Sequence, residues 1–113
     1  MIEQYSAGRI RINGINYEND VKIIKGKVRP EWWRKRGHRI GEEDIKDVFD
    51  AAPDILVVGT GYAENVRISS EVAVKAEARS IELIAEATPQ AVKTFNRLLS
   101  EGKSVSGAFH LTC

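Results

Sequence analysis

The chain has 113 residues, a length that suits one domain with a single hydrophobic core. Hydrophobic residues make up 42% of the chain and the formal net charge is +1, so neither property indicates a general attraction to nucleic acid or to a membrane surface. No apolar run approaches the roughly 18 residues of a membrane-spanning helix, and the N-terminus does not resemble a signal peptide, so we expect a cytoplasmic protein.

The N-terminal section predicts antiparallel β structure. Residues 9–12 alternate between basic and apolar, Asn13-Gly14 is typical of a two-residue hairpin turn, and residues 15–17 form the returning strand. A second turn at residues 19–20 leads into residues 21–24, which we expect to pair with the preceding strand. An isolated hairpin is only marginally stable, so this section must pack onto the rest of the chain.

From residue 41 the pattern changes to alternating helices and strands. Acidic residues at 42–44 suit the first turn of a helix that ends at Pro53. Residues 55–58 form an uncharged, largely β-branched run, which predicts a strand buried on both faces.

Two further helix and strand pairs follow. We expect a helix over 70–79, a strand over 81–85, a helix that starts at Thr88 and ends at Gly102, and a strand over 105–111. Strand–helix–strand connections of this length predict that successive strands are neighbours in one sheet. The pattern therefore predicts an α/β fold with an additional antiparallel β section.

The Gly59-Thr60-Gly61 loop is the first candidate site, because ligands of α/β sheets most often bind at the carboxyl ends of strands. A dinucleotide fingerprint would need a small residue where the chain has Glu64, and a helix directly after the loop. Two interpretations remain. The glycines form a tight structural turn, or the loop binds a smaller polar or anionic ligand.

The ligand interpretation predicts a pocket between two segments. If strands 55–58 and 81–85 are parallel neighbours, Gly59–Tyr62 lies at the same sheet edge as the helix start at Thr88. Asn96 lies at the border of the buried stripe of that helix, where its amide is hydrogen-bonded within the fold or contacts a ligand. The candidate ligand-binding residues are Gly59, Thr60, Gly61, Tyr62, Thr88 and Asn96.

A basic segment is the second candidate site. Residues 21–40 contain eight basic residues against one acidic residue, a balance of +7, and residues 41–54 contain six acidic residues against one basic residue, a balance of −5. Aromatic residues among basic residues are one signature of nucleic-acid binding, which here would involve residues 22–39. Neighbouring blocks of opposite charge also fit a solvated, salt-bridged face that contacts a protein partner. The residues of this candidate interaction surface are Trp32, Trp33, Arg34, Arg36 and Arg39.

We expect two structural features in the basic segment. Residues 34–37 should form an exposed loop, and at least one of the two tryptophans should lie in the core.

The sequence contains no recognisable catalytic motif or metal-ligand cluster. His38 and His110 are the only histidines, and we expect both at the surface or in local hydrogen bonds. Cys113, the only cysteine, excludes an internal disulfide bond and has no evident activating base. We therefore assign no catalytic residue, no metal and no cofactor.

The stretch from Thr88 to Cys113, together with the Gly-Thr-Gly loop, resembles a known family over nearly the whole chain. The most specific pieces are Asp54–Gly61, Ala91–Asn96, Glu101-Gly102 and Gly107–Cys113. The chain is similar to small archaeal and bacterial hypothetical proteins related to the adipogenesis-associated Mth-domain proteins of animals. A mitochondrial complex I assembly factor is a more distant relative.

The resemblance implies a layered α/β fold in which a mixed central sheet has flanking helices and a small N-terminal antiparallel β section. It implies no established enzyme activity. We expect one domain over residues 1–113, with a β-rich part in 1–30 and a helix followed by strand–helix–strand–helix–strand in 41–113.

The leading hypothesis is a non-catalytic protein-interaction or assembly module, and a homodimer would fit its size. The first alternative is a ligand-binding protein or enzyme with a pocket at residues 59–62 and 88–96. The second alternative is nucleic-acid binding through residues 22–39.

Overall fold

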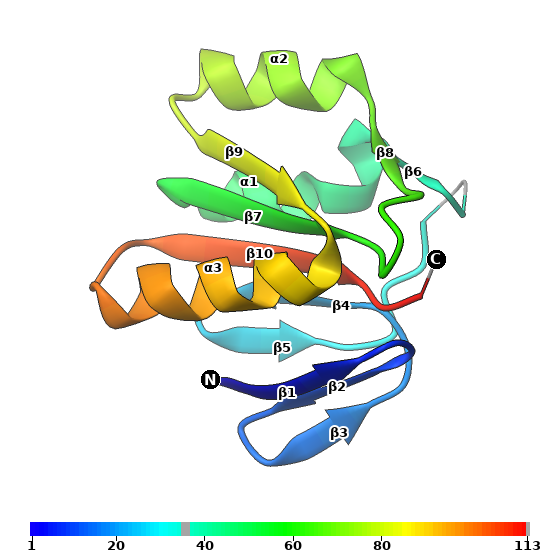
Figure 1. Cartoon of the computed structure of the whole chain (residues 1–113). Helices are drawn as coiled ribbons and strands as arrows, with labels where there is room; N and C mark the ends of the chain where they lie inside the picture. The colour runs from blue at the N-terminus through cyan, green and yellow to red at the C-terminus, as the bar shows by residue number, and fades with distance from the viewer. Residues whose placement is uncertain (35–36, 113) are drawn as a thin grey trace.

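A mixed five-stranded sheet forms the centre of the fold, in a computed structural model that describes residues 1–34 and 37–112. The strand order is β5-β4-β10-β7-β9 (Figure 1). These strands are β4 (Val21–Ile24), β5 (Lys27–Arg29), β7 (Ile55–Thr60), β9 (Glu82–Glu86) and β10 (Val105–His110). β10 is parallel to β7 and antiparallel to β4, so the predicted mixed α/β sheet is confirmed.

Helices cover both faces of this sheet, as predicted. α3 (Thr88–Ser100) lies on one face, in front of β10 in Figure 1. The other face packs against η1 (Glu42–Ile45), α1 (Lys46–Ala51) and α2 (Ser70–Ala78).

The order of the parallel strands differs in part from the prediction. β9 is the parallel neighbour of β7, as expected. The prediction that β10 lies beside β9 is wrong, because α3 carries the chain back across β7 to its other side. All six residues of β10 are buried, which requires a central position in the sheet. β9 contains the charged residues Glu82 and Glu86, which fit an edge strand.

A smaller antiparallel sheet contains β1 (Ile2–Ser6), β2 (Arg9–Ile12) and β3 (Ile15–Tyr17). The predicted β2–β3 hairpin is confirmed, with φ of 50° at Asn13 and 83° at Gly14. The predicted pairing of β4 with β3 is wrong: all four β4 residues are buried, and β4 lies between β5 and β10 in the large sheet. β1 and the parallel pair β6 (Arg39–Ile40) and β8 (Arg67–Ile68) are not among the predicted strands.

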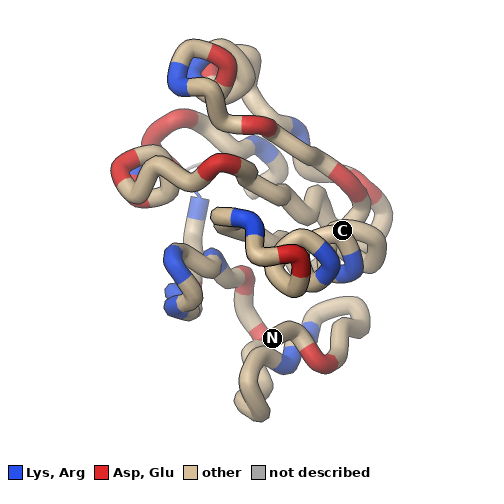
Figure 2. Tube along the Cα trace, turned by 90° about the vertical axis from the view of Figure 1, so that its left-hand side faces the viewer, with Lys and Arg blue, Asp and Glu red and all other residues tan. Residues whose placement is uncertain are grey.

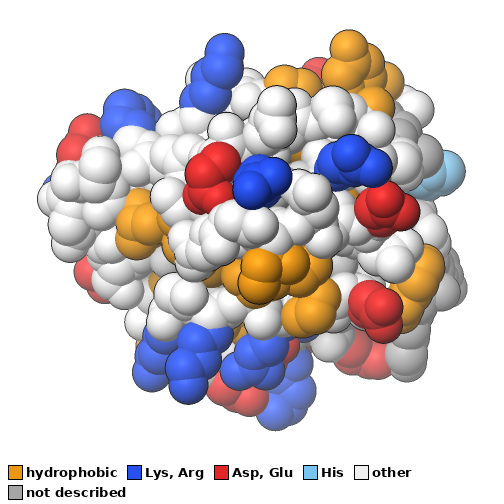
Figure 3. Space-filling view, turned by 90° about the horizontal axis from the view of Figure 1, so that it is seen from below, with side chains coloured by type: hydrophobic (Ala, Val, Ile, Leu, Met, Phe, Trp, Pro, Cys, Tyr) orange, Lys and Arg blue, Asp and Glu red, His pale blue; other side chains and the backbone are white. Residues whose placement is uncertain are grey.

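The surface of the described chain mixes both signs of charge. Figure 2 shows acidic and basic positions interspersed over the trace, in line with a net charge of +1. Figure 3 shows the molecule from below the view of Figure 1, and on this face hydrophobic side chains lie between charged ones. Within the described residues, no helix is long and apolar enough to cross a membrane.

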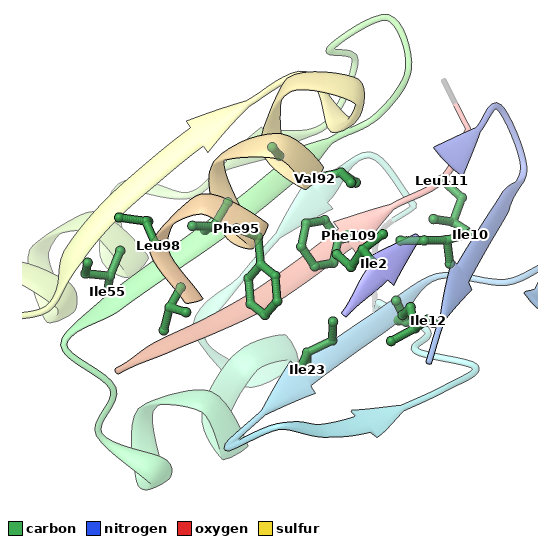
Figure 4. Packing of buried hydrophobic residues seen from close by; sticks show 14 residues of the cluster. Ile2, Ile10, Ile12, Ile23, Ile55, Val92, Phe95, Leu98, Phe109 and Leu111 are labelled. Carbon is green, nitrogen blue, oxygen red and sulfur yellow. The ribbon is translucent and has the colours of Figure 1, made fainter. Parts of the chain in front are cut away.

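The small sheet and α3 share one hydrophobic cluster. Ile10 and Ile12 of β2 point toward Phe95 of α3 and Phe109 of β10 (Figure 4). The rings of Phe95 and Phe109 meet edge to face, with centroids 5.6 Å apart. The N-terminal sheet is therefore held by the same core as α3, which supplies the packing that an isolated hairpin lacks.

Gly107 of β10 lies where even a methyl group is excluded. A Cβ atom there would lie 2.5 Å from Cε2 of Phe109 and 3.1 Å from Cδ1 of Phe95. We expect Gly107→Ala to lower the free energy of unfolding by about 1–3 kcal/mol, because the added carbon displaces rings that fill the core. In the control Gly37→Ala the new Cβ would have nothing within 4 Å, so its urea midpoint should change little. Equal midpoints for the two variants would contradict this packing.

Candidate functional site

The carboxyl ends of β7, β9 and β10 lie at one edge of the central sheet, on the right in Figure 1. This edge is the usual location of ligand sites in α/β sheets. The turn before β4 and the segment after β5 also reach it. Where these segments meet, Asp20, Arg34 and His110 form a largely buried polar group that we call the Asp20 cluster.

Asp20 is the centre of this cluster. Its Oδ2 accepts an N–H from Nη1 of Arg34 at 2.6 Å and lies 2.5 Å from Nδ1 of His110. Its Oδ1 accepts the backbone N–H of Leu111 at 2.8 Å. The side chains of Asp20, Arg34 and His110 are 13%, 5% and 7% exposed. Burial opposes ionisation of Asp20, but the hydrogen bonds from His110, Leu111 and Arg34 outweigh burial and lower its pKa.

Nδ1 of His110 lies between a carboxylate, which only accepts hydrogen bonds, and a guanidinium, which only donates them. It is 2.5 Å from Oδ2 of Asp20 and 2.7 Å from Nη2 of Arg34, so it donates to Asp20 in one tautomer and accepts from Arg34 in the other. Nη2 of Arg34 also donates to the carbonyl of Gly37 at 2.9 Å. Nε2 of His110 is buried and has no hydrogen-bond partner among the described residues. The adjacent guanidinium charge disfavours a metal cation at this nitrogen.

The segment that leads to Arg34 contains the two tryptophans, which have opposite environments. Trp32 is 6% exposed. Its backbone N–H donates to the carbonyl of Asp20 at 2.8 Å, and its indole N–H donates to the carbonyl of Asp44 at 3.0 Å. The Arg34 guanidinium lies 5.1 Å from the Trp32 ring centroid, within cation–π range. Trp33 is 75% exposed, although both of its neighbours are fastened to the fold.

The acidic block neutralises part of the basic segment, as one prediction proposed. Nζ of Lys22 lies 2.8 Å from each carboxylate oxygen of Asp47, and Nη1 of Arg29 lies 3.9 Å from the same carboxylate. Lys22 itself is buried, so its charge contributes to this internal pair rather than to an outer binding face.

The candidate interaction surface is divided by the fold. Trp33 and Arg39 are exposed, and Trp32 is the tryptophan that was expected in the core. The prediction that Arg34 is exposed is wrong, because its side chain is 5% exposed and pairs with Asp20. Arg36 lies outside the described residues.

The Gly59-Thr60-Gly61 segment and the start of α3 meet at the sheet edge, as predicted. The predicted loop begins only at Gly61, because Gly59 and Thr60 are the last two residues of β7. Oγ1 of Thr88 accepts the N–H of Gly61 at 2.9 Å and donates to the carbonyl of His110 at 2.6 Å. The N–H of Thr88 donates in turn to the carbonyl of Gly61 at 3.0 Å. Thr60 is 8% exposed and Thr88 is fully buried, so this junction is a hydrogen-bonded turn. Tyr62, at 58%, is the exposed member of the candidate ligand-binding residues that meet here.

Asn96 does not join the other candidate ligand-binding residues. It lies eight residues beyond Thr88, about 12 Å along the helix axis. Its amide accepts the N–H of Ile2 at 3.1 Å and donates to the carbonyl of Ile2 at 2.7 Å. Both contacts fasten β1 to α3, which is the structural alternative that the sequence left open.

The described residues contain no group of three or more His, Cys, Asp or Glu side chains that could hold a metal ion. The two histidine rings meet edge to face, with centroids 6.2 Å apart. Cys113 lies outside the described residues.

The prediction that His110 lies at the surface or in local hydrogen bonds is wrong. It is buried, and its partner Asp20 is 90 positions away in the sequence. One signal could have found it. A histidine inside an apolar strand must be buried, and a buried polar group needs a partner. Asp20, in contrast, lies in an Asn-Asp pair typical of turns, which conceals its role.

Comparison with known proteins identifies one family. The family described as "Protein of unknown function (DUF498/DUF598)" matches residues 2–110. This match covers nearly all of the chain and includes every residue of the Asp20 cluster.

Solved structures share the fold over almost the full length. A conserved hypothetical protein from Pyrococcus horikoshii OT3 is 24% identical with a TM-score of 0.88, covering 100% of this chain and 99% of its own. A protein from Bartonella henselae described as an outer membrane protein is 25% identical with a TM-score of 0.85, covering 99% and 94%. A Bordetella pertussis protein described as an Mth938-like domain is 20% identical with a TM-score of 0.71, covering 98% and 85%. The predicted relationship to Mth-domain proteins is confirmed.

Removal of the Asp20 charge should destabilise the fold. We expect Asp20→Asn to lower the free energy of unfolding by about 3–5 kcal/mol, because the Arg34 charge is left buried without its partner. Glu18→Gln is the control, since Glu18 pairs with Arg9 at 3.2 Å with side chains 70% and 59% exposed. Its effect should stay below about 1 kcal/mol. Urea unfolding measures both variants, and equal effects would refute the role of the cluster.

Asp20 should also make stability depend on pH. Its pKa is lowered in the folded state, so its contribution is present above the unfolded pKa and is lost as pH falls through the folded pKa. Hydrogen bonds from Gly14 to Glu3 and from Lys75 to Glu42 lower the pKa of those carboxyls too, in wild type and variant alike. The difference between wild type and Asp20→Asn should therefore shrink below about pH 4. Unfolding curves taken at a series of pH values test this, and a constant difference would contradict an ionised Asp20.

Proposed function

The chain belongs to the DUF498/DUF598 family of proteins of unknown function, and we propose that it acts as a non-catalytic protein-interaction or assembly module. The observation that carries the proposal is the position of Trp33. This indole is 75% exposed between two residues whose side chains are buried. The proposed module binds its partner through the surface that contains Trp33.

An exposed tryptophan held in this way suits a binding anchor. Tryptophan is enriched among the residues that dominate binding energy at protein interfaces. Trp32 is fixed by its bonds to Asp20 and Asp44, and Arg34 by its pair with Asp20, so the backbone of Trp33 is already ordered. A preordered anchor loses less conformational freedom on binding than a flexible one. A partner would therefore offer an apolar pocket for the indole.

The same contacts support the alternatives less well. In the ligand-binding hypothesis, Thr60, Gly61 and Thr88 would need groups free to meet a ligand, but they bond to neighbouring segments. In the nucleic-acid hypothesis, Lys22 and Arg34 would need to face phosphates, but both pair with buried or half-buried carboxylates. Among the residues described, neither hypothesis has an observation comparable with the exposed Trp33.

The proposal includes a cytoplasmic location, as expected from the sequence. The Bartonella henselae relative is described as an outer membrane protein, so location can differ between proteins of this fold. Fractionation of source cells, followed by immunoblotting, tests the proposed location directly.

Site-specific photocrosslinking tests the proposed interaction surface. A photoreactive phenylalanine analogue at position 33 should give a discrete adduct with a partner in source cells, because that side chain would lie inside the interface. The control is the same analogue at position 62, where Tyr62 is also aromatic and 58% exposed. The variant Trp33→Ala should keep the wild-type melting temperature and lose co-purification of the crosslinked partner.

Four outcomes decide the proposal. A partner adduct confined to position 33 supports it. Adducts of equal yield at positions 33 and 62 contradict a specific surface, as does unchanged co-purification with Trp33→Ala. An adduct with the mass of two chains from purified protein alone would identify a homodimer as the assembly instead.

A further inference from the structure

β9 is an outer edge of the central sheet. Within the described chain the strand order ends at β9, whose only neighbour is β7. Ala85 is exposed, and Leu83 and Ile84 are only partly buried, so α2 and α3 do not cover this strand completely. Such an edge presents backbone groups that can pair with another strand.

The parallel register shows which backbone groups face outward. The N–H of Glu82 donates to the carbonyl of Asp54 in the segment that leads into β7. In a parallel ladder the bonding residues alternate along the strand, so Glu82, Ile84 and Glu86 direct their N–H and C=O groups to β7. Leu83 and Ala85 direct theirs away from the sheet. The edge therefore offers two N–H donors and two carbonyl acceptors to an added strand.

The side chains of β9 give this edge a defined chemical pattern. Glu82, Ile84 and Glu86 share the face toward α3, where Ile84 packs against the core. Oε1 of Glu86 accepts the hydroxyl of Thr94 at 2.6 Å, which holds the carboxylate at the end of the strand. The pattern along this face is acidic, apolar and acidic.

This pattern disfavours a second copy of the chain. In the antiparallel pairing with the longest overlap, Ile84 faces Ile84 of the second copy, and Glu82 faces Glu86 of the second copy. Like charges directly opposite each other destabilise a strand pair, and opposite charges stabilise it. The two carboxylates therefore disfavour pairing with a second copy. They favour a partner strand that has basic residues opposite Glu82 and Glu86.

We infer that β9 is a docking edge for an extended segment of another protein in which two basic residues flank an apolar residue at alternate positions. The segment adds a sixth strand to the sheet, a recognition mode in which backbone hydrogen bonds supply affinity and alternate side chains supply specificity. This surface is separate from Trp33, so the inference does not depend on the proposed function. Loss of binding at one surface leaves the other intact.

A synthetic peptide tests the inference with purified full-length protein. The probe is a fluorescein-labelled peptide with the central residues Lys-Thr-Val-Thr-Lys, and its control carries Glu in place of both Lys residues. Fluorescence anisotropy should show saturable binding of the basic peptide that weakens at high salt, and no binding of the acidic peptide. In two-dimensional NMR spectra, the amides of Leu83 and Ala85 should shift more than those of β4.

Two variants separate backbone pairing from charge. Ala85→Pro removes an outward N–H but no bond to β7, and proline is tolerated on an edge strand in this orientation. It should weaken binding about tenfold or more. Glu82→Lys does not depend on the fold tolerating proline. It should weaken binding of the basic peptide and allow the acidic peptide to bind. Glu18→Lys, directly after β3, is the charge-matched control and should bind like wild type.

Four results with the peptide probe would overturn the inference. They are no saturable binding of the basic peptide, wild-type affinity in Glu82→Lys, amide shifts confined to other elements, and wild-type affinity in a folded Ala85→Pro. Self-association of the wild type that Ala85→Pro abolishes would show that a second copy is the occupant, contrary to the inference.

Discussion

The largely buried carboxylate of Asp20 imposes the constraint that the rest of the site satisfies. An ionised group can stay inside a fold only where hydrogen bonds and an opposite charge replace its water. Here the guanidinium of Arg34, the imidazole of His110 and the backbone of Leu111 supply them. These donors come from the segment after β5 and from the end of β10, so one side chain joins the two segments at the carboxyl edge of the sheet. The backbone of Trp33 is ordered as a result, because Trp32 and Arg34 on either side of it both bond to Asp20.

The sequence predicts the parts of the fold that local patterns determine. The uncharged run at 55–58 lies in β7, and the Thr88-Pro89 pair begins α3. Both features can be predicted because strand burial and helix initiation depend on residues that are neighbours in the sequence. The approach of Gly61 to Thr88 followed from parallel pairing of the two strands before them. In each case the pattern contains the physical cause.

Long-range contacts are what the sequence could not show. His110 and Asp20 are 90 positions apart, and nothing near either residue indicates the other. In the sequence, Arg34 cannot be distinguished from the other basic residues of its segment, because only the fold brings it to Asp20. The placement of β4 also depends on β10, which comes last among the strands. The Asp20 cluster is therefore a tertiary feature. It lies at the sheet edge where the sequence predicted a ligand site, but none of the residues predicted for that site belongs to it.

The central claim is that Asp20 holds the Trp33 segment and the end of β10 together, and amide hydrogen exchange tests it most directly. The measurement compares wild type with Asp20→Asn under conditions in which both are folded. The account predicts that the amides of Trp32 and Leu111 lose protection together in the variant, whereas amides in β7 keep theirs. Unchanged protection at Trp32 and Leu111 in the variant would contradict the account.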